Sequence, residues 1–129
     1  MILQDDGVRM TVDSYSSTHP PLPPTTEDDR FLWLRLLRSR RVGVSTFFRL
    51  MSEHGTARAC LDALPDIAAA AGVDDYRICP EGVVQAELTA ARRHDARMLC
   101  IGDADYPTAL CDIPDPPPIL WVRGAPEVW

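Results

Sequence analysis

The chain has 129 residues, of which 46% are hydrophobic and 25% charged, and its formal net charge at pH 7 is −6. This composition is typical of a globular protein and excludes a wholly disordered chain. No apolar run approaches the roughly 20 residues that span a bilayer, and the acidic N-terminal segment MILQDDGVRM does not resemble an export signal, so we expect a cytoplasmic protein without membrane contact.

Residues 1–26 are polar and contain the proline-rich stretch HPPLPPTT, which favours extended geometry, so we predict a disordered leader. Thr26 is suited to cap a helix over residues 27–39, whose first turn is acidic. The leucines and Trp33 of this segment cover a wide arc of the helix, which predicts burial on most sides.

Further short helices are expected with tight turns between them. Gly43 permits a turn and Ser45 can cap a helix that ends at Gly55. A third helix follows to residue 64, where Pro65 should stop it, then a short one at 67–71 and a longer one at 80–95 that starts with Pro80. Residues 27–95 are thus predicted to form a helical domain that folds alone.

The pattern changes after residue 95. Residues 98–101 and 119–122 are short apolar runs, as expected of strands in a mainly parallel, doubly covered sheet, with a possible short helix at 108–112 between them. Two strands cannot complete such a domain. We therefore expect residues 96–129 to be the incomplete start of an α/β domain, with rapid amide exchange.

Two ordered sets of residues are distinctive. The C-terminal set is Gly102-Asp103-x-Asp105-Tyr106-Pro107-x-x-Leu110 followed by Ile113-x-Asp115-Pro116-Pro117-Pro118-Ile119-Leu120-Trp121-Val122-Arg123-Gly124. The helical set is Leu36-Leu37, Val42-Gly43, Phe47, Leu50 and Gly55. Together the two sets resemble the DprA/Smf (DNA-processing protein A) family over roughly residues 30–124. The resemblance implies a sterile-alpha-motif-like or helix-hairpin-helix-like domain followed by the first strands of a Rossmann-like domain.

The same resemblance implies a recombination mediator that binds single-stranded DNA without strong sequence preference, dimerises and helps to load the RecA recombinase in natural transformation. The family's glycine-rich Gly-Ser-Arg loop would lie beyond Trp129, so the main DNA-binding residues are not assigned in this sequence. Two alternatives stay open: a helical protein-interaction module without DNA contact, and a fragment of a Rossmann-type nucleotide-binding enzyme.

Accessory DNA contacts are predicted in the first inter-helix turn. Six arginines lie between residues 30 and 49, and no acidic residue occurs from 31 to 52. The amides of Gly43 and Ser45 at a helix start, with Arg38, Arg40 and Arg41, suit a phosphate group. An ordinary turn beside a solvated basic face is the competing explanation.

The remaining candidates favour structural roles. The four cysteines form no CxxC pair, which predicts reduced, buried thiols and no zinc site. Four acidic side chains are expected to be solvated loop residues. Tyr106 and Trp121 could stack on bases, but Trp121 lies inside a strand-like run, which favours a core role for it. Two of the three histidines are expected to sit at helix C-termini. These acidic residues and histidines are Asp103, Asp105, Asp112, Asp115, His54 and His94. No catalytic set, phosphate loop or cofactor motif is found, so we do not expect an enzyme.

Overall fold

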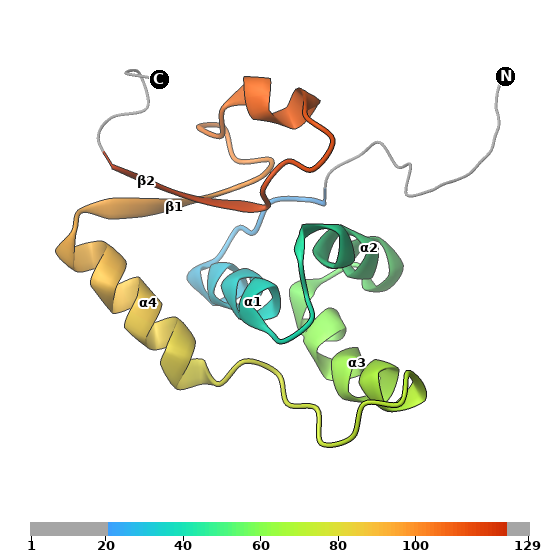
Figure 1. The fold of residues 1–129 in the computed structure, drawn as a ribbon. Coiled ribbons are helices and arrows are strands. Elements are labelled where there is room, and N and C mark those ends of the chain that lie inside the picture. Colours follow the sequence, from blue (N-terminus) through green and yellow to red (C-terminus); the bar gives the residue numbers. More distant parts are fainter. Residues whose placement is uncertain (1–20, 124–129) are drawn as a thin grey trace, which may run out of the picture.

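The computed structural model describes residues 21–123, which form four helices and a two-stranded sheet (Figure 1). The helices are α1 (Glu27–Arg38), α2 (Val44–His54), α3 (Ala57–Ala70) and α4 (Glu81–Arg93). The strands β1 (Ala96–Cys100) and β2 (Ile119–Arg123) enclose a short 3-10 helix, η1 (Thr108–Asp112). Helix α1 contacts all three other helices, with α4 on one side and α2 and α3 on the other.

Most helix boundaries follow the predicted capping residues. Thr26 accepts a hydrogen bond from the Asp29 amide at 3.0 Å, and Gly55 ends α2 with a left-handed φ of 88°. Helix α4 begins one residue later than predicted, with Pro80 as its N-cap. The cap of α2 differs from the prediction, because Gly43 occupies the N-cap position without a side-chain hydrogen bond and Ser45 lies inside the first turn.

The predicted break at Pro65 is wrong. Helix α3 continues through this proline to Ala70, so the two predicted short helices are one. A proline inside a helix costs about 3 kcal/mol because it removes a backbone hydrogen bond. Here Leu61, Leu64 and Ala68 form one buried face that runs across the proline, and burial of that face favours the continuous helix.

The sheet prediction is wrong in direction. The two strands pair antiparallel, with Ala96 opposite Arg123 and Cys100 opposite Ile119, whereas a mainly parallel sheet was expected. The connection, residues 101–118, contains a short 3-10 helix and no α-helix that could cross over the sheet, so the chain returns beside β1 as a wide hairpin. The predicted helix at 108–112 is confirmed as a 3-10 helix.

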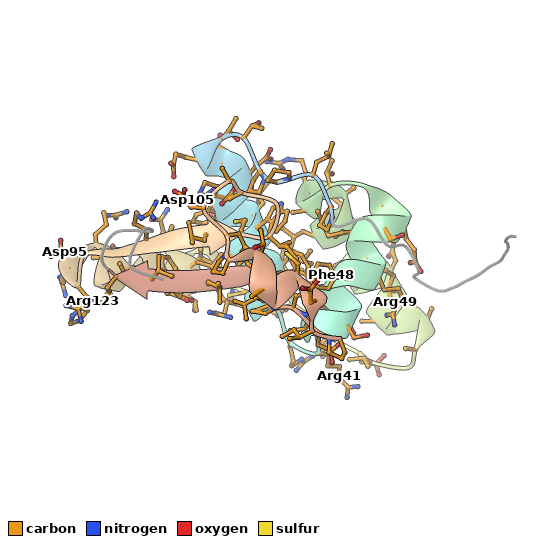
Figure 2. The ribbon with its side chains drawn as sticks, turned by 90° about the horizontal axis from the view of Figure 1, so that it is seen from above. Arg41, Phe48, Arg49, Asp95, Asp105 and Arg123 are labelled. Carbon is orange, nitrogen blue, oxygen red and sulfur yellow. The ribbon has the colours of Figure 1, made fainter. Side chains whose placement is uncertain are left out.

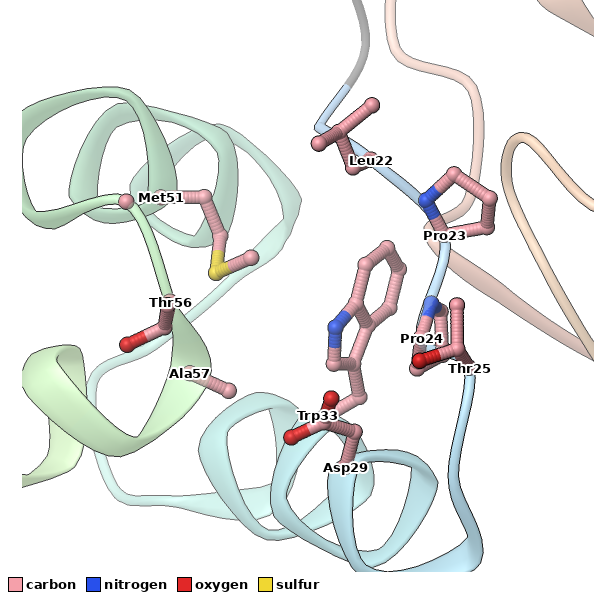
Figure 3. A pocket seen from close by; sticks show the side chains of 10 residues that line it. Leu22, Pro23, Pro24, Thr25, Asp29, Trp33, Met51, Thr56 and Ala57 are labelled. Atoms are coloured by element: carbon pink, nitrogen blue, oxygen red, sulfur yellow. The ribbon is translucent and has the colours of Figure 1, made fainter.

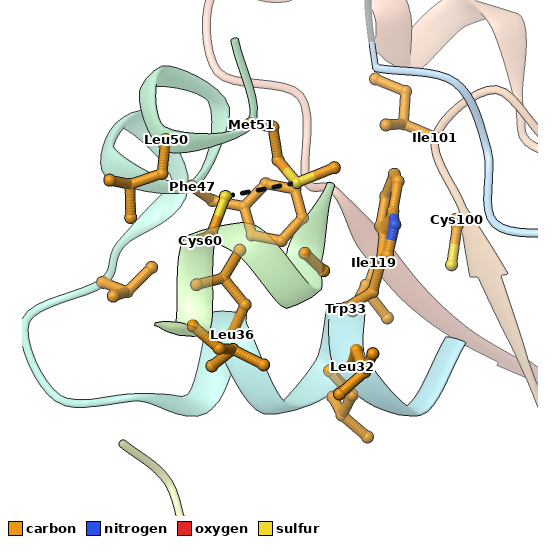
Figure 4. Close-up of a cluster of buried hydrophobic side chains, with 14 of the residues drawn as sticks. Leu32, Trp33, Leu36, Phe47, Leu50, Met51, Cys60, Cys100, Ile101 and Ile119 are labelled. Carbon is orange, nitrogen blue, oxygen red and sulfur yellow. Dashed lines mark hydrogen bonds between the residues drawn. The ribbon is translucent and has the colours of Figure 1, made fainter. Parts of the chain in front are cut away.

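One hydrophobic core extends through the helices and the hairpin. Trp33 is 3% exposed and packs edge-on against Phe47, with ring centroids 5.2 Å apart. Figure 4 shows Trp33 between Phe47 on the helical side and Cys100 and Ile101 on the hairpin side. The domain boundary near residue 95 stays a prediction, and side chains from both sides of it share this core.

The last residues before α1 pack against the helices, unlike the expected disordered leader; residues 1–20 of that leader lie outside the described part of the chain. Pro24 is buried, and a side chain at Gly102 would come within 3.0 Å of the Pro23 ring. Residues 22–25 form one wall of a pocket of about 250 Å³ over Trp33 (Figure 3). This segment therefore covers one end of the core.

Three of the four cysteines are buried thiols as predicted, and Cys111 is exposed. Burial raises the pKa of Cys60 to about 11 and that of Cys100 to about 12, which keeps both protonated and unreactive. Among residues 21–123, no helix is long and apolar enough to cross a bilayer. The same residues contain no group of three metal-binding side chains in a suitable arrangement.

Candidate nucleic-acid interface

The turn between α1 and α2 is held in place by a loop that comes from much later in the chain. Ser39 is 4% exposed; its hydroxyl donates to the Arg35 carbonyl at 2.8 Å and accepts from the Cys79 amide at 3.0 Å. The Tyr76 hydroxyl donates to the Arg40 carbonyl at 2.5 Å. These hydrogen bonds fix the backbone on both sides of Ser39, so the turn is built rigidly.

The left-handed residue of this turn is Arg41, with φ of 69°, and not Gly43, which has φ of −92°. A side chain would therefore fit the backbone at Gly43, and a β-carbon there would meet no atom within 4 Å. The absence of a side chain leaves the α2 N-terminus open. No side chain of the described part of the chain caps its first-turn amides, which carry the positive end of the helix dipole.

The six clustered arginines divide into two groups. Arg30 pairs with Asp103 and donates to the Met98 carbonyl, Arg35 donates to the Cys79 carbonyl at 2.7 Å, and Arg38 binds Glu87 through two hydrogen bonds of 2.8 and 2.9 Å. These three side chains connect α1 to the rest of the fold. Arg38, predicted as a DNA contact, is thus occupied by a carboxylate from α4.

Arg40, Arg41 and Arg49 form the second group, which we call the basic rim. All three are exposed, and no carboxylate from the described part of the chain pairs with them. The Arg40 guanidinium lies over the Tyr76 ring, 5.3 Å from its centroid. Figure 2 places Arg41 and Arg49 on the helical side of the molecule, far from Asp95 and Arg123.

The basic rim borders a groove between α2, the end of α3 and the loop that carries Tyr76. Its lining contains three arginines and no acidic side chain, and the remainder is largely apolar. The full set is Arg40, Arg41, Val42, Thr46, Arg49, Leu50, Leu64, Ile67, Ala68, Ala71, Val73 and Tyr76. Burial raises the pKa of Tyr76 against the opposing charge of Arg40, so its phenol stays a hydrogen-bond donor.

Other predicted site residues have structural roles. The Asp103 carboxylate accepts from the Cys100 amide at 2.7 Å, and Asp105 pairs with Arg97 at 3.3 Å. Tyr106 is 4% exposed and donates to the Pro117 carbonyl at 2.6 Å, so it lies in the core and its ring is not free to stack on a base. Trp121 is half-buried, and its indole N–H donates to Glu87 at 2.8 Å.

The histidines and the remaining loop acids are accounted for as follows. His54 is the last residue of α2 and His94 caps the C-terminus of α4, which confirms their predicted positions. Asp112 and Asp115 are exposed, as expected. Sequence reasoning missed Tyr76 and Glu87, and it named Arg49 only as one of the cluster. Tyr76 and Glu87 contact partners that lie more than 30 residues away in the chain, and no local sequence pattern predicts such contacts.

Four helices around one core, with a tight basic turn between the first two, define a helix-hairpin-helix type of domain. Residues 27–90 match the family described as the DprA-like N-terminal HHH domain, and this part of the chain belongs to that family. The resemblance to DprA/Smf proteins is thereby confirmed for the helical part. The match ends before β1, so the resemblance of residues 102–124 stays a prediction. No curated protein shows significant similarity to the chain.

Proposed function

We propose that the chain binds DNA through the basic rim and the open N-terminus of α2, as part of a DprA-type DNA-processing protein. The observation that carries this proposal is the division of the arginines. Half of the cluster is neutralised by structural partners, while Arg40, Arg41 and Arg49 gather around one groove without acidic neighbours in its lining. Exposed guanidinium groups beside unpaired helix amides suit phosphate oxygens.

The family of the helical part supports a proposal for the wider role. We propose that the whole protein binds single-stranded DNA in the cytoplasm, acts as a homodimer and assists RecA loading, with the hairpin of β1 and β2 opening a Rossmann-like domain. The helical domain would supply accessory contacts to the DNA backbone. We propose a binding role and not a catalytic one for the described residues.

The test measures binding of the 129-residue chain to a labelled single-stranded oligonucleotide by fluorescence anisotropy over a range of salt concentrations. Replacing all three arginines of the rim by Ala should weaken binding and reduce the slope of log K against log salt by about 2, because each phosphate contact on a single strand contributes about 0.7. The matched control replaces Arg92, Arg93 and Arg123 by Ala. These arginines are exposed outside the basic rim, and their replacement removes the same amount of charge.

The control variant should keep the wild-type salt slope. An equal loss of affinity in both variants would mean that only net charge matters and would refute the assigned interface. An unchanged slope in the rim variant would favour the protein-interaction alternative.

A further inference from the structure

The groove beside the basic rim is shaped for more than a phosphate. Its volume is about 140 Å³, and an apolar cavity of about 150 Å³ is large enough for one benzene ring. Ile67 is 37% exposed on its wall, and Ala71 is also exposed to solvent. An apolar hollow of this size contributes nothing to phosphate binding, which requires only charge and hydrogen-bond donors.

The positions of the arginines around the groove suit a single strand. Arg40 and Arg41 come from the turn before α2, whereas Arg49 comes from the second turn of the helix, so guanidinium groups border the hollow from two elements. In a duplex the bases are paired and stacked inside, and only phosphates and sugars reach a protein surface of this kind. An unpaired base in a single strand can leave the stack and enter an apolar site.

We infer that this groove accepts one unstacked base of a single strand while the basic rim holds the phosphates on either side. The inference rests on the proposed DNA-binding function and adds to it a preference for single strands that originates in the helical domain. The apolar walls from α2 and α3 contact the base, and Tyr76, held by Arg40, closes the groove on the side of the loop.

The experiment compares two labelled oligonucleotides of equal length, one of thymidines and one with the same backbone but abasic sites. The wild-type chain should bind the thymidine strand at least about fivefold more tightly, which corresponds to the lower end of the contribution of one base contact. Ala71→Leu should fill the groove and abolish this difference, while affinity for the abasic strand stays the same. Ala70→Leu, the exposed neighbour outside the groove, is the control and should behave as wild type.

The outcomes separate the two proposals. Equal affinity of the wild type for both strands overturns the base site but leaves DNA binding intact, whereas no binding to either strand overturns both. If Ala71→Leu lowers the affinity for both strands equally, the substitution has disturbed the basic rim, and this result also refutes the base site. If Ala71→Leu weakened binding of an acidic, leucine-containing peptide but left the affinity for both strands unchanged, the groove would be a protein-docking site and the base site would be wrong.

Discussion

Glu87 joins three elements that are distant in the chain, and its removal should destabilise the whole fold. One carboxylate oxygen accepts from the Arg38 Nε at 2.9 Å, and the other accepts from the terminal guanidinium nitrogen of Arg38 and from the Trp121 indole, both at 2.8 Å. Helices α1 and α4 and strand β2 therefore meet at one side chain. The side chains of Arg38 and Glu87 are 39% and 26% exposed, so water screens their attraction.

The magnitude follows from these contacts. A partly exposed bidentate ion pair contributes about 1 kcal/mol, and a half-buried indole N–H without an acceptor costs about 1 kcal/mol more. Glu87→Ala should thus lower the free energy of unfolding by about 2 kcal/mol, or the melting temperature by roughly 10 °C. Thermal denaturation followed by circular dichroism measures this. Glu81→Gln is the control, because Glu81 is 71% exposed and lies 3.7 Å from Arg35, and it should change stability by less than about 0.5 kcal/mol.

The pH dependence gives an independent readout. The hydrogen bond from Arg38 lowers the pKa of Glu87, and the indole hydrogen bond acts in the same direction. A lowered folded-state pKa gives stability that is present above the unfolded value of about 4.3 and is lost as the pH falls below it. Glu87→Gln cannot titrate at this position, so it should be less stable than wild type at pH 7. This difference in unfolding free energy should shrink below about pH 4. A deficit of constant size across this range, or none at pH 7, would refute this account of the cluster.

Two further predictions concern the turn and the hairpin. Gly43→Ser should leave thermal stability unchanged or raise it, because serine is a better N-cap that has a side-chain acceptor. The same substitution should weaken DNA binding, because the serine hydroxyl would accept from the α2 amides that a phosphate needs. Unchanged affinity in anisotropy titrations would show that no phosphate binds there. A chain ending at residue 95 should lose several kcal/mol of unfolding free energy, because the core includes five side chains of the hairpin: Met98, Leu99, Cys100, Ile101 and Ile119. In the full chain the Ile101 amide, which donates to the Pro118 carbonyl, should exchange slowly with solvent. A truncated chain as stable in urea as the full chain would support the predicted domain boundary instead.

The elements were predictable where a local chemical signal defines them. Thr26, Gly55 and Pro80 lie where short-range capping rules place them, within about one residue. Pro65 was misjudged because a local rule was applied where tertiary burial decides, and the buried face of α3 continues through it. Strand direction depends on how the intervening loop folds, which apolar runs alone do not specify.

The candidate site was only half predictable, and the reason is electrostatic. Counting charges identified an arginine-rich segment, but it could not say which arginines already have partners, because Asp103, Glu87 and the Cys79 carbonyl come from more than 40 residues away. The fold uses Arg30, Arg35 and Arg38 to attach α1 to the loop, α4 and the hairpin. What remains is a smaller positive surface on a chain of net charge −6. Because no acidic residue among residues 21–123 lines the groove, local charge and not net charge should govern the approach of a polyanion to the basic rim.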